Sequence, residues 1–224
     1  MPEPMTPRQS TPPATFPQAT GKVFVVGITG ASGAAYSLRL LDQLLTLGST
    51  VHLIVTDYGK RLLSDEMNIT SISLATMCPH LAAFDQSNPS PDSYHSRLII
   101  HPNKDVGALP ATGSFLHDGM VILPCSSTSL GAIATGAGSN LLTRAAAVTL
   151  KERRPLIICH RETPLNLIDI NNMQTLTHAG AIIAPCNPGL YLNPQSINDL
   201  VDFITGKALD LLNIDHDLKT RWEG

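Results

Sequence analysis

A short run of small residues, GITGASG at positions 27–33, follows an apolar segment and precedes a helical pattern. Small residues let the backbone approach a ligand closely, and the first turn of a helix presents unpaired N–H groups and the positive end of its dipole to an anion. The glycines lie three apart, so this run is not the dinucleotide pattern GxGxxG. We predict an anion site here; the alternative is a tight turn with Ser32 as a helix cap.

A second polar run, PCSSTS at positions 124–129, follows another apolar segment. Consecutive hydroxyl groups at the end of a strand can hydrogen-bond a phosphate, a ribityl chain or the edge of a ring, although simple helix capping is an alternative. One ligand shared by two polar loops at neighbouring strand ends explains both loops better than capping alone. The four hydroxyl residues are Ser126, Ser127, Thr128 and Ser129.

Basic residues form a third candidate group. Arg144 and Lys151 lie seven apart on one predicted helix, so they share a face about 10 Å apart. Lys207 lies on the last predicted helix, and a solvated charged face is the ordinary interpretation of all three. Arg161 and Glu162 differ, because they come directly after a predicted strand, where ligands of α/β sheets bind.

Short apolar runs alternate with helical patterns along the chain. Buried parallel strands have such continuous apolar runs, and we expect strands at 23–28, 51–55, 97–100, 120–123, 156–159 and 181–184. We expect helices at 34–47, 140–153, 164–178 and 197–212. This alternation predicts a single-domain α/β fold, a doubly wound, mainly parallel sheet of Rossmann-like or flavodoxin-like type. Residues 67–95 look irregular, and we expect a mobile loop over the site.

The first 20 residues are rich in proline and threonine and lack the apolar core of a signal peptide. We therefore predict a disordered tail over residues 1–21 and one domain over residues 22–224. The net charge is −3 without a dense basic run, which argues against nucleic acid as the main partner. No run of 18 apolar residues occurs, so we expect no transmembrane helix.

The four cysteines show no CxxC spacing, which argues against a zinc site or a dithiol motif. Cys125, Cys159 and Cys186 lie at or near the ends of apolar runs. We interpret them as buried free thiols in a reducing compartment, and we expect a cytoplasmic protein.

Several motifs together resemble the UbiX family of flavin prenyltransferases. The motifs are GITGASG, PCSSTS, IATGAGSNLLTRAA, LKERRPLI, HRETP, and PGLY followed by DLVDF. They occur in the family's order and spacing over residues 22–223. The resemblance implies transfer of a dimethylallyl group from dimethylallyl monophosphate to N5 and C6 of reduced FMN, without a metal. It also implies a UbiD-type decarboxylase that receives the prenylated FMN, and a homo-oligomer, expected to be a dodecamer.

The resemblance also assigns roles to individual positions. The flavin-binding positions are Gly30, Ala31, Ser32, Thr56, Ser126, Ser127, Thr128, Ser129 and Arg161. Tyr191 and Lys207 match positions that hold the prenyl phosphate, and Arg144 and Lys151 match further residues of that pocket. Arg144 is the candidate for reaching in from another subunit.

Three residues are implied in proton transfer. Ser32 and Glu66 match residues assigned to acid–base steps, while Glu162 belongs to the phosphate pocket. A prenyl monophosphate leaves poorly without a metal, so cations and a proton donor must stabilise the departing phosphate. Glu162 can supply that proton, and Glu66 with Ser32 can remove one during ring closure. Apart from the resemblance, Glu66 would be interpreted as a surface residue.

The sequence departs from the family pattern at three positions. Lys207 stands where arginine is common, which keeps the charge but loses bidentate contact. Ala147 replaces a common aspartate, and we expect the loss of a structural hydrogen bond. Val106 replaces a tryptophan of the prenyl pocket, which bears on donor selectivity.

Two other functions remain as alternatives. One is an FMN-dependent decarboxylase of cysteine-type substrates with the same fold, although residues 34–47 contain no histidine in the matching place. The other is a flavin-binding partner without catalysis.

Overall fold

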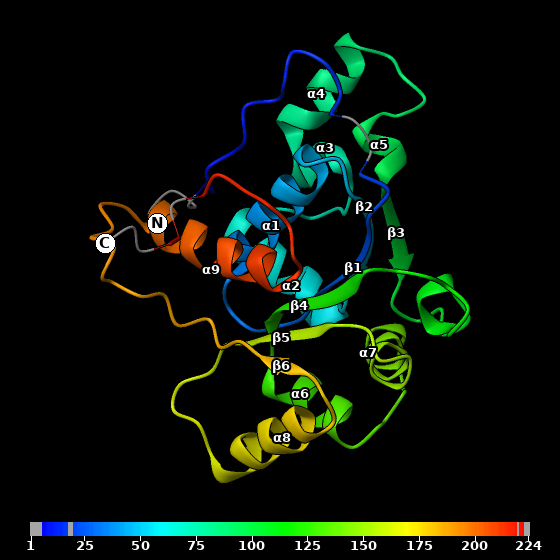
Figure 1. Cartoon of the computed structure of the whole chain (residues 1–224), viewed down its shortest axis with the longest axis vertical. Coiled ribbons are helices and arrows are strands. Elements are labelled where there is room, and N and C mark those ends of the chain that lie inside the picture. The colour runs from blue at the N-terminus through cyan, green and yellow to red at the C-terminus, as the bar shows by residue number, and fades with distance from the viewer. Residues whose placement is uncertain (1–5, 18–19, 219, 222–224) are drawn as a thin grey trace.

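The computed structural model describes residues 6–17, 20–218 and 220–221. These residues form a layered α/β structure (Figure 1). In chain order the elements are β1 (Val23–Ile28), α1 (Ala34–Thr46), β2 (Thr50–Val55), α2 (Asp57–Met67), α3 (Leu74–Met77), α4 (Pro79–Ser87), α5 (Tyr94–Arg97), β3 (Leu98–Pro102), η1 (Leu109–Ala111), β4 (Gly119–Cys125), α6 (Ser127–Ala134), α7 (Leu141–Lys151), β5 (Leu156–His160), α8 (Leu167–His178), β6 (Ile182–Ile183) and α9 (Ile197–Leu211).

The strands form one six-stranded sheet in the order β3-β2-β1-β4-β5-β6. Every neighbouring pair is parallel. The chain moves outward from β1 to β3 and then returns to place β4 on the other side of β1, so the sheet is doubly wound, as predicted. In such sheets ligands bind beyond the carboxyl ends of the strands at this reversal point. The site is therefore expected after β1 and β4.

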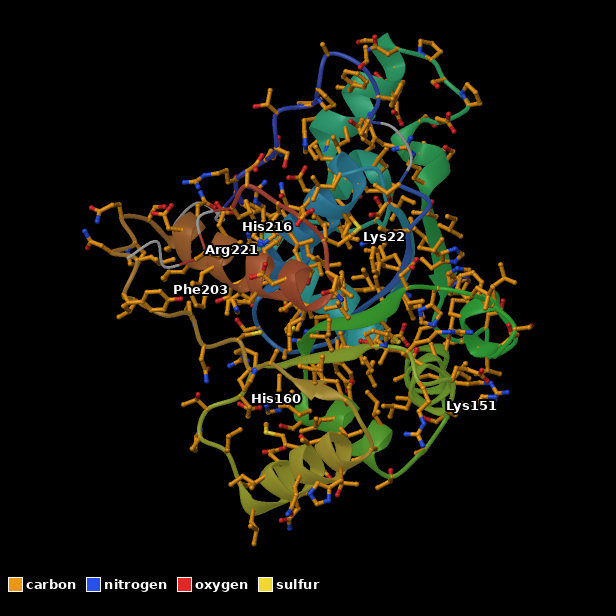
Figure 2. All side chains as sticks on the ribbon, in the orientation of Figure 1. Lys22, Lys151, His160, Phe203, His216 and Arg221 are labelled. Carbon is orange, nitrogen blue, oxygen red and sulfur yellow. The ribbon has the colours of Figure 1, made fainter. Side chains whose placement is uncertain are left out.

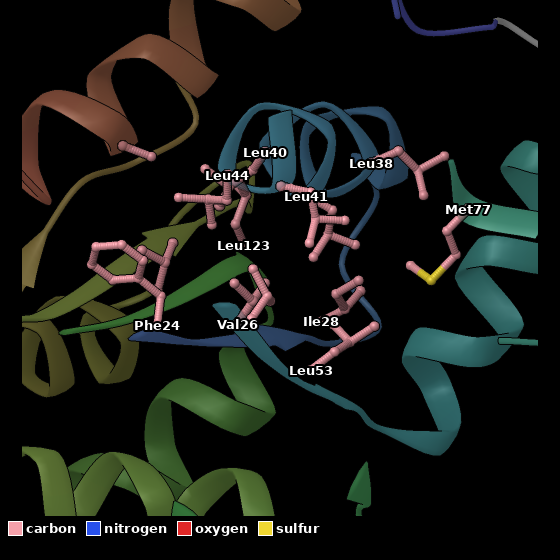
Figure 3. Close-up of a cluster of buried hydrophobic side chains, with 14 of the residues drawn as sticks. Phe24, Val26, Ile28, Leu38, Leu40, Leu41, Leu44, Leu53, Met77 and Leu123 are labelled. Atoms are coloured by element: carbon pink, nitrogen blue, oxygen red, sulfur yellow. The ribbon is translucent and has the colours of Figure 1, made fainter. Parts of the chain in front are cut away.

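Each face of the sheet has its own apolar core. Phe24, Val26 and Ile28 of β1 point to the face covered by α1 and α9, where α1 contributes a leucine row including Leu41 and Leu44 (Figure 3). The alternate residues of β1 and β4 belong to a second cluster with α6, α7 and α8 on the opposite face (Figure 1). Strand side chains alternate between the two faces of the sheet, and helices cover both faces. Residues on both sides of the central strands are therefore buried, which explains the continuous apolar runs.

The prediction for residues 67–95 is wrong. This stretch contains α3, α4 and α5, and it contributes Leu74, Met77, Leu81 and Tyr94 to the core on the α1 face. Ser73 caps α3 by accepting a hydrogen bond from the backbone N–H of Thr76. The segment is a packed helical part of the fold rather than a loop over the site.

The proposed tail is described in part. Residues 1–5 and 18–19 lie outside the described residues, and residues 6–17 contain no helix or strand. Arg8 and Ser10 nevertheless make side-chain hydrogen bonds to α9 and α1. The division into a tail over 1–21 and a domain over 22–224 stays a prediction. No helix in the described part of the chain is long and apolar enough to cross a membrane.

Candidate active site

The loop between β1 and α1 is shaped by two glycines. A Cβ at Gly30 would lie 2.4 Å from the Cβ of Tyr58, so only glycine allows the loop to pass the start of α2. Gly33 has a φ of 126° and a Cβ there would meet the ring of Tyr36 at 2.7 Å. The glycines therefore allow this loop to pack closely against Tyr36 and Tyr58, and Ser32 lies just before the start of α1.

The N-terminus of α1 holds a carboxylate from the protein itself. Glu66, in the last turn of α2, accepts hydrogen bonds from the N–H of Gly33 at 3.1 Å and of Ala34 at 2.9 Å. An anion is favoured at this end of a helix. The prediction of unpaired N–H groups here is thus wrong for Gly33 and Ala34, because Glu66 accepts from both.

Hydrogen bonds join the loop after β1 to the loop after β4. The hydroxyl of Thr29 donates to the carbonyl of Pro124 at 2.8 Å and accepts from the N–H of Ser126 at 2.8 Å. Ser126 caps α6 by accepting from the N–H of Ser129. The two polar loops predicted to share a ligand are therefore adjacent. Thr29 was not among the predicted residues, since a buried threonine at a strand end gives no signal of its own.

The loop after β5 joins the same group. Arg161 donates from Nε to the carbonyl oxygen of Ser32 at 3.1 Å, and its backbone N–H donates to Cys125 at 3.2 Å. The hydroxyl of Ser127 lies 3.2 Å from Nε2 of His160, whose pKa is lowered by burial. His160 was missed in the sequence analysis; its place at the end of a strand, directly before Arg161, was the signal that could have found it.

Tyr36 is a third residue that the sequence did not single out. Its ring packs at Gly33, and its side chain is half-buried. Burial raises the pKa of the phenol, with the Arg161 guanidinium acting in the opposite direction. Tyr36 therefore stays protonated near Arg161 and Glu66.

Thr56 and Glu162 have local partners. Thr56 caps α2 by accepting from the N–H of Gly59 at 3.0 Å, and its own N–H donates to Ile28 at the end of β1. Glu162 is exposed and accepts from the N–H of Thr163 at 3.1 Å. Thr56 thus lies beside the first loop, while the carboxylate of Glu162 bonds to the backbone of its own neighbour.

The remaining basic residues of the prediction do not join this group. Arg144 lies exposed in the first turn of α7, and Lys151 ends that helix beside Glu152, 3.1 Å away. Lys151 precedes β5 and Arg161 follows it, and five strand residues span roughly 16 Å. Figure 2 accordingly shows Lys151 well apart from His160 at the other end of β5.

Tyr191, in the segment before α9, and Lys207, on α9, both lie beside Phe203. The ring of Tyr191 meets that of Phe203 edge-on, with centroids 5.8 Å apart. Phe203 and Lys207 are four apart in α9 and so share a face. Lys207 also lies 3.7 Å from Asp210. The two residues implied in prenyl-phosphate binding therefore form a second group, borne by α9 and the segment before it.

The two non-catalytic departures from the family pattern, Ala147 and Val106, lie outside both groups. Ala147 is partly buried within α7, and Val106 is 44% exposed in the segment between β3 and η1. The four cysteines are free and buried, as expected. Burial raises the pKa of Cys186 to about 12 and also raises the pKa values of Cys125 and Cys159. Among the described residues no group of three His, Cys, Asp or Glu could hold a metal ion.

A doubly wound sheet with polar, hydrogen-bonded loops at its reversal point is the arrangement of a nucleotide- or flavin-binding α/β protein. The model of the Flavoprotein family matches residues 17–209. Flavin prenyltransferase UbiX from Halalkalibacterium halodurans is 42% identical over 200 residues, 89% of this chain and 93% of that protein. The chain therefore belongs to the Flavoprotein family, within its UbiX-type flavin prenyltransferases.

Solved structures agree with this assignment. AnUbiX in complex with FMN and dimethylallyl pyrophosphate is 34% identical with a TM-score of 0.76, covering 91% of this chain and 98% of that one. A dodecameric FMN-dependent UbiX-like decarboxylase from Escherichia coli O157:H7 is 30% identical with a TM-score of 0.77, covering 90% and 99%. The FMN-dependent cysteine decarboxylase TvaF, at 13% identity and a TM-score of 0.56, shares the fold alone.

Proposed function

We propose that this enzyme transfers a dimethylallyl group from dimethylallyl monophosphate to N5 and C6 of reduced FMN. The product, prenylated FMN, then serves a UbiD-type decarboxylase. One observation carries the proposal: the guanidinium of Arg161 is fastened to the carbonyl of Ser32, on the loop whose next two N–H groups hold Glu66. A guanidinium and a carboxylate thus both contact the loop that carries Ser32, at the carboxyl ends of β1 and β5.

The residues present suit FMN. The flavin supplies the nucleophilic ring positions when it is bound. Gly30 removes a side chain where the backbone passes closest to α2, and Ser126 to Ser129 offer hydroxyls at the start of α6. Arg161 supplies a positive charge beside them. We assign phosphate and polyol binding to the α6 loop, because Glu66 already occupies the N-terminus of α1.

The prenyl phosphate requires more positive charge than this group contains. A departing phosphate is stabilised by cations and donors already fixed in place. Arg144, Lys151, Tyr191 and Lys207 are the proposed additional residues, with Glu162 as proton donor. Lys151 lies at the opposite end of β5 from Arg161, so one chain does not supply both to a single phosphate.

We therefore propose that a second copy completes the site. Mixing two inactive variants tests this directly. Arg161→Ala and Lys151→Ala proteins, each dissociated and then reassembled together, should regain part of the activity, because some sites receive both intact residues. Each variant reassembled alone is the control. No recovery in the mixture would show that both residues act within one chain.

The reaction itself is tested anaerobically with reduced FMN and dimethylallyl monophosphate, by the absorption spectrum and mass of the flavin product. Dimethylallyl pyrophosphate, present in the AnUbiX structure, is the matched second donor. We expect faster turnover with the monophosphate. FMN binding without a product of higher mass for either donor would favour a non-catalytic flavin carrier, and turnover of a peptide with a C-terminal cysteine would favour the decarboxylase.

We place this activity in the cytoplasm. All four cysteines are free thiols, which suits a reducing compartment. Expression of the full chain with a fluorescent fusion partner tests the location.

A further inference from the structure

An N-terminal segment that lies before the matched family region, except for its last residue, makes specific contacts with the domain. The family model begins at residue 17, yet residues 8–17 contact α1, α9 and the α4–α5 region. We refer to residues 8–17 as the strap. Its two ends are fastened in different ways.

One end of the strap is fastened by aromatic packing. The ring of Phe16 meets Phe84 edge-on with centroids 5.0 Å apart, and lies 5.4 Å from Tyr94. The carbonyl of Pro17 accepts a hydrogen bond from Arg97 at 3.0 Å. Tyr94 is fully buried, so this end of the strap adds to the apolar core.

The other end is fastened by charge. Arg8 donates from its backbone N–H to the side chain of Asn198 at 3.0 Å, and its guanidinium pairs with Asp199 at 3.0 Å and Asp202 at 2.7 Å. All three partners lie in the first two turns of α9. One side chain of the strap thus holds the start of α9 through two carboxylates.

Asp202 links this contact to the buried interior. Its other carboxylate oxygen accepts from Nε of Arg39 at 2.6 Å, and Arg39 pairs in turn with Asp42 at 2.7 Å. Ser10 donates to Asp42 from both its N–H and its hydroxyl. Buried charges require partners, and the strap supplies Arg8 and Ser10 to this network.

Asp199 links the same contact to the segment that carries Tyr191. While one oxygen pairs with Arg8, the other accepts the N–H groups of Gln195 and Ser196, both at 2.9 Å. Asp199 therefore fixes the end of the segment that begins at Tyr191. Holding Asp199 in place also holds that segment.

This segment borders a cavity rather than the packed core. The cavity has a volume of about 760 Å³, and it is lined by residues 8–11 of the strap, parts of α1 and α9, Gly189, residues 192–195, Asp217 and Leu218. Residues 192–195 of the Tyr191 segment face this cavity on one side, so the contacts where the segment meets α9 help to fix its position. Arg8, on the wall formed by the strap, supplies one of them through Asp199.

We propose that the strap positions the Tyr191 segment for binding of the prenyl phosphate, and that Arg8 is its positioning residue. The proposal rests on the assignment of Tyr191 to prenyl-phosphate binding made above. Arg8 does not contact substrate in this role. It acts by fixing Asp199, and through it the segment preceding α9.

The test is the KM for dimethylallyl monophosphate at saturating reduced FMN. Arg8→Ala should raise this KM about 2- to 10-fold, the range expected for losing charge-assisted contacts at a partly exposed position. The affinity for FMN and kcat should stay as in the unaltered protein. Arg8→Lys, which keeps one ion pair, should give an intermediate KM, and Gln9→Ala on the exposed neighbouring position should change nothing.

A Tyr191→Ala arm separates the two proposals. A raised KM in Tyr191→Ala together with an unchanged KM in Arg8→Ala overturns the role of the strap and leaves that of Tyr191 standing. An unchanged KM in Tyr191→Ala overturns the assignment of Tyr191, and the proposal for the strap with it. Equal loss of FMN and prenyl-phosphate binding in Arg8→Ala also overturns the proposal, because it indicates a general effect on folding.

Discussion

Glu66 illustrates how one side chain can serve structure and chemistry together. Its carboxylate accepts two N–H groups from the first turn of α1, next to Ser32. A carboxylate in this position stabilises the helix start. The same contact holds the carboxylate oxygens of Glu66 next to the loop between β1 and α1, to which Arg161 is also bound. Structural and catalytic contributions of Glu66 must therefore be measured separately.

At the residue scale we predict that Glu66→Gln binds FMN and prenyl phosphate but forms product about 10²–10⁴-fold more slowly, the usual contribution of a general acid or base. Glutamine keeps one acceptor oxygen for the N–H groups of α1 but does not exchange a proton. Rapid-mixing measurements under single-turnover conditions would report the chemical step. Unchanged turnover would exclude an acid–base role for Glu66.

Lys207→Ala is the matched comparison for Glu66→Gln. Deleting this charge should weaken binding of the prenyl phosphate while the chemical step at saturating donor is retained. The two variants should therefore fail at different stages. A common defect in FMN affinity would instead point to a shared structural cause.

At the element scale, the helices between α2 and β3 explain how a short, irregular-looking stretch can be rigid. Leu81 of α4 is fully buried in the core on the α1 face, whereas Gln86 of the same helix is exposed. Local helix propensity alone does not stabilise helices of this length. Their order comes from burial of Leu74, Met77, Leu81 and Tyr94 in the core cluster that includes the leucines of α1.

Leu81→Ala should therefore lower the free energy of unfolding by about 2–5 kcal/mol, the cost of removing a buried leucine side chain. Gln86→Ala should change it by less than about 0.5 kcal/mol, as at other exposed positions. Equilibrium denaturation of both variants makes the comparison. If Leu81→Ala lowered the free energy of unfolding by less than about 1 kcal/mol, this segment would be only loosely packed against the core.

The strands and the helices α1, α7, α8 and α9 were predictable because their signals are local, whereas α2 was not predicted. The apolar runs located all six strands, although the run at 181–184 shortens to Ile182–Ile183 in β6. The leucine row of α1 was equally visible. By contrast, α3 and α4 are too short to show a helical period, and their burial depends on residues far away in sequence.

The site was predictable in its loops but not in its contacts. Residues 27–33 and 124–129 carry a local signature of small and hydroxyl residues. The contact between Glu66 and Ala34 joins positions 32 apart, and that between Arg161 and Ser32 joins positions 129 apart. Such contacts follow from the strand order, which places β5 next to β4 and β4 next to β1.

At the scale of the whole molecule, three histidines on the α7 face make stability depend on pH. Nδ1 of His52 lies 2.8 Å from Nε2 of His101, and Phe115 packs between His52 and His117. Burial, with His101 and His117 adding to it, lowers the pKa of His52 from 6.5 to about 4. Burial also lowers the pKa values of His101 and His117.

The unfolded chain consequently binds protons that the folded chain does not bind between pH 6.5 and about 4. We predict that the free energy of unfolding falls as pH decreases through this window. His52→Gln should reduce the slope, whereas His95→Gln at an exposed position should leave it unchanged. Denaturant titrations at a series of pH values would measure it, and equal slopes for His52→Gln and the unaltered protein would contradict the prediction.

Assembly is the last property at this scale, and α8 indicates where copies meet. Leu167 and Ile168 are 69% and 71% exposed, and Ile170 is 48% exposed. Contiguous exposed apolar side chains mark interaction surfaces. We predict a large homo-oligomer, expected to be a dodecamer, that persists on dilution because α8 buries these residues against another copy.

Ile168→Glu should therefore dissociate the assembly, since the contact would have to bury an unpaired charge. Gln174→Glu adds the same charge to the same helix at an exposed polar position and should leave the assembly intact. Light scattering coupled to size-exclusion chromatography gives the mass of each variant. Because the proposed site takes residues from two copies, the dissociated Ile168→Glu protein should also lose prenyl transfer while its fold, followed by circular dichroism, is retained. A fully active monomer would contradict both the predicted assembly and the shared site.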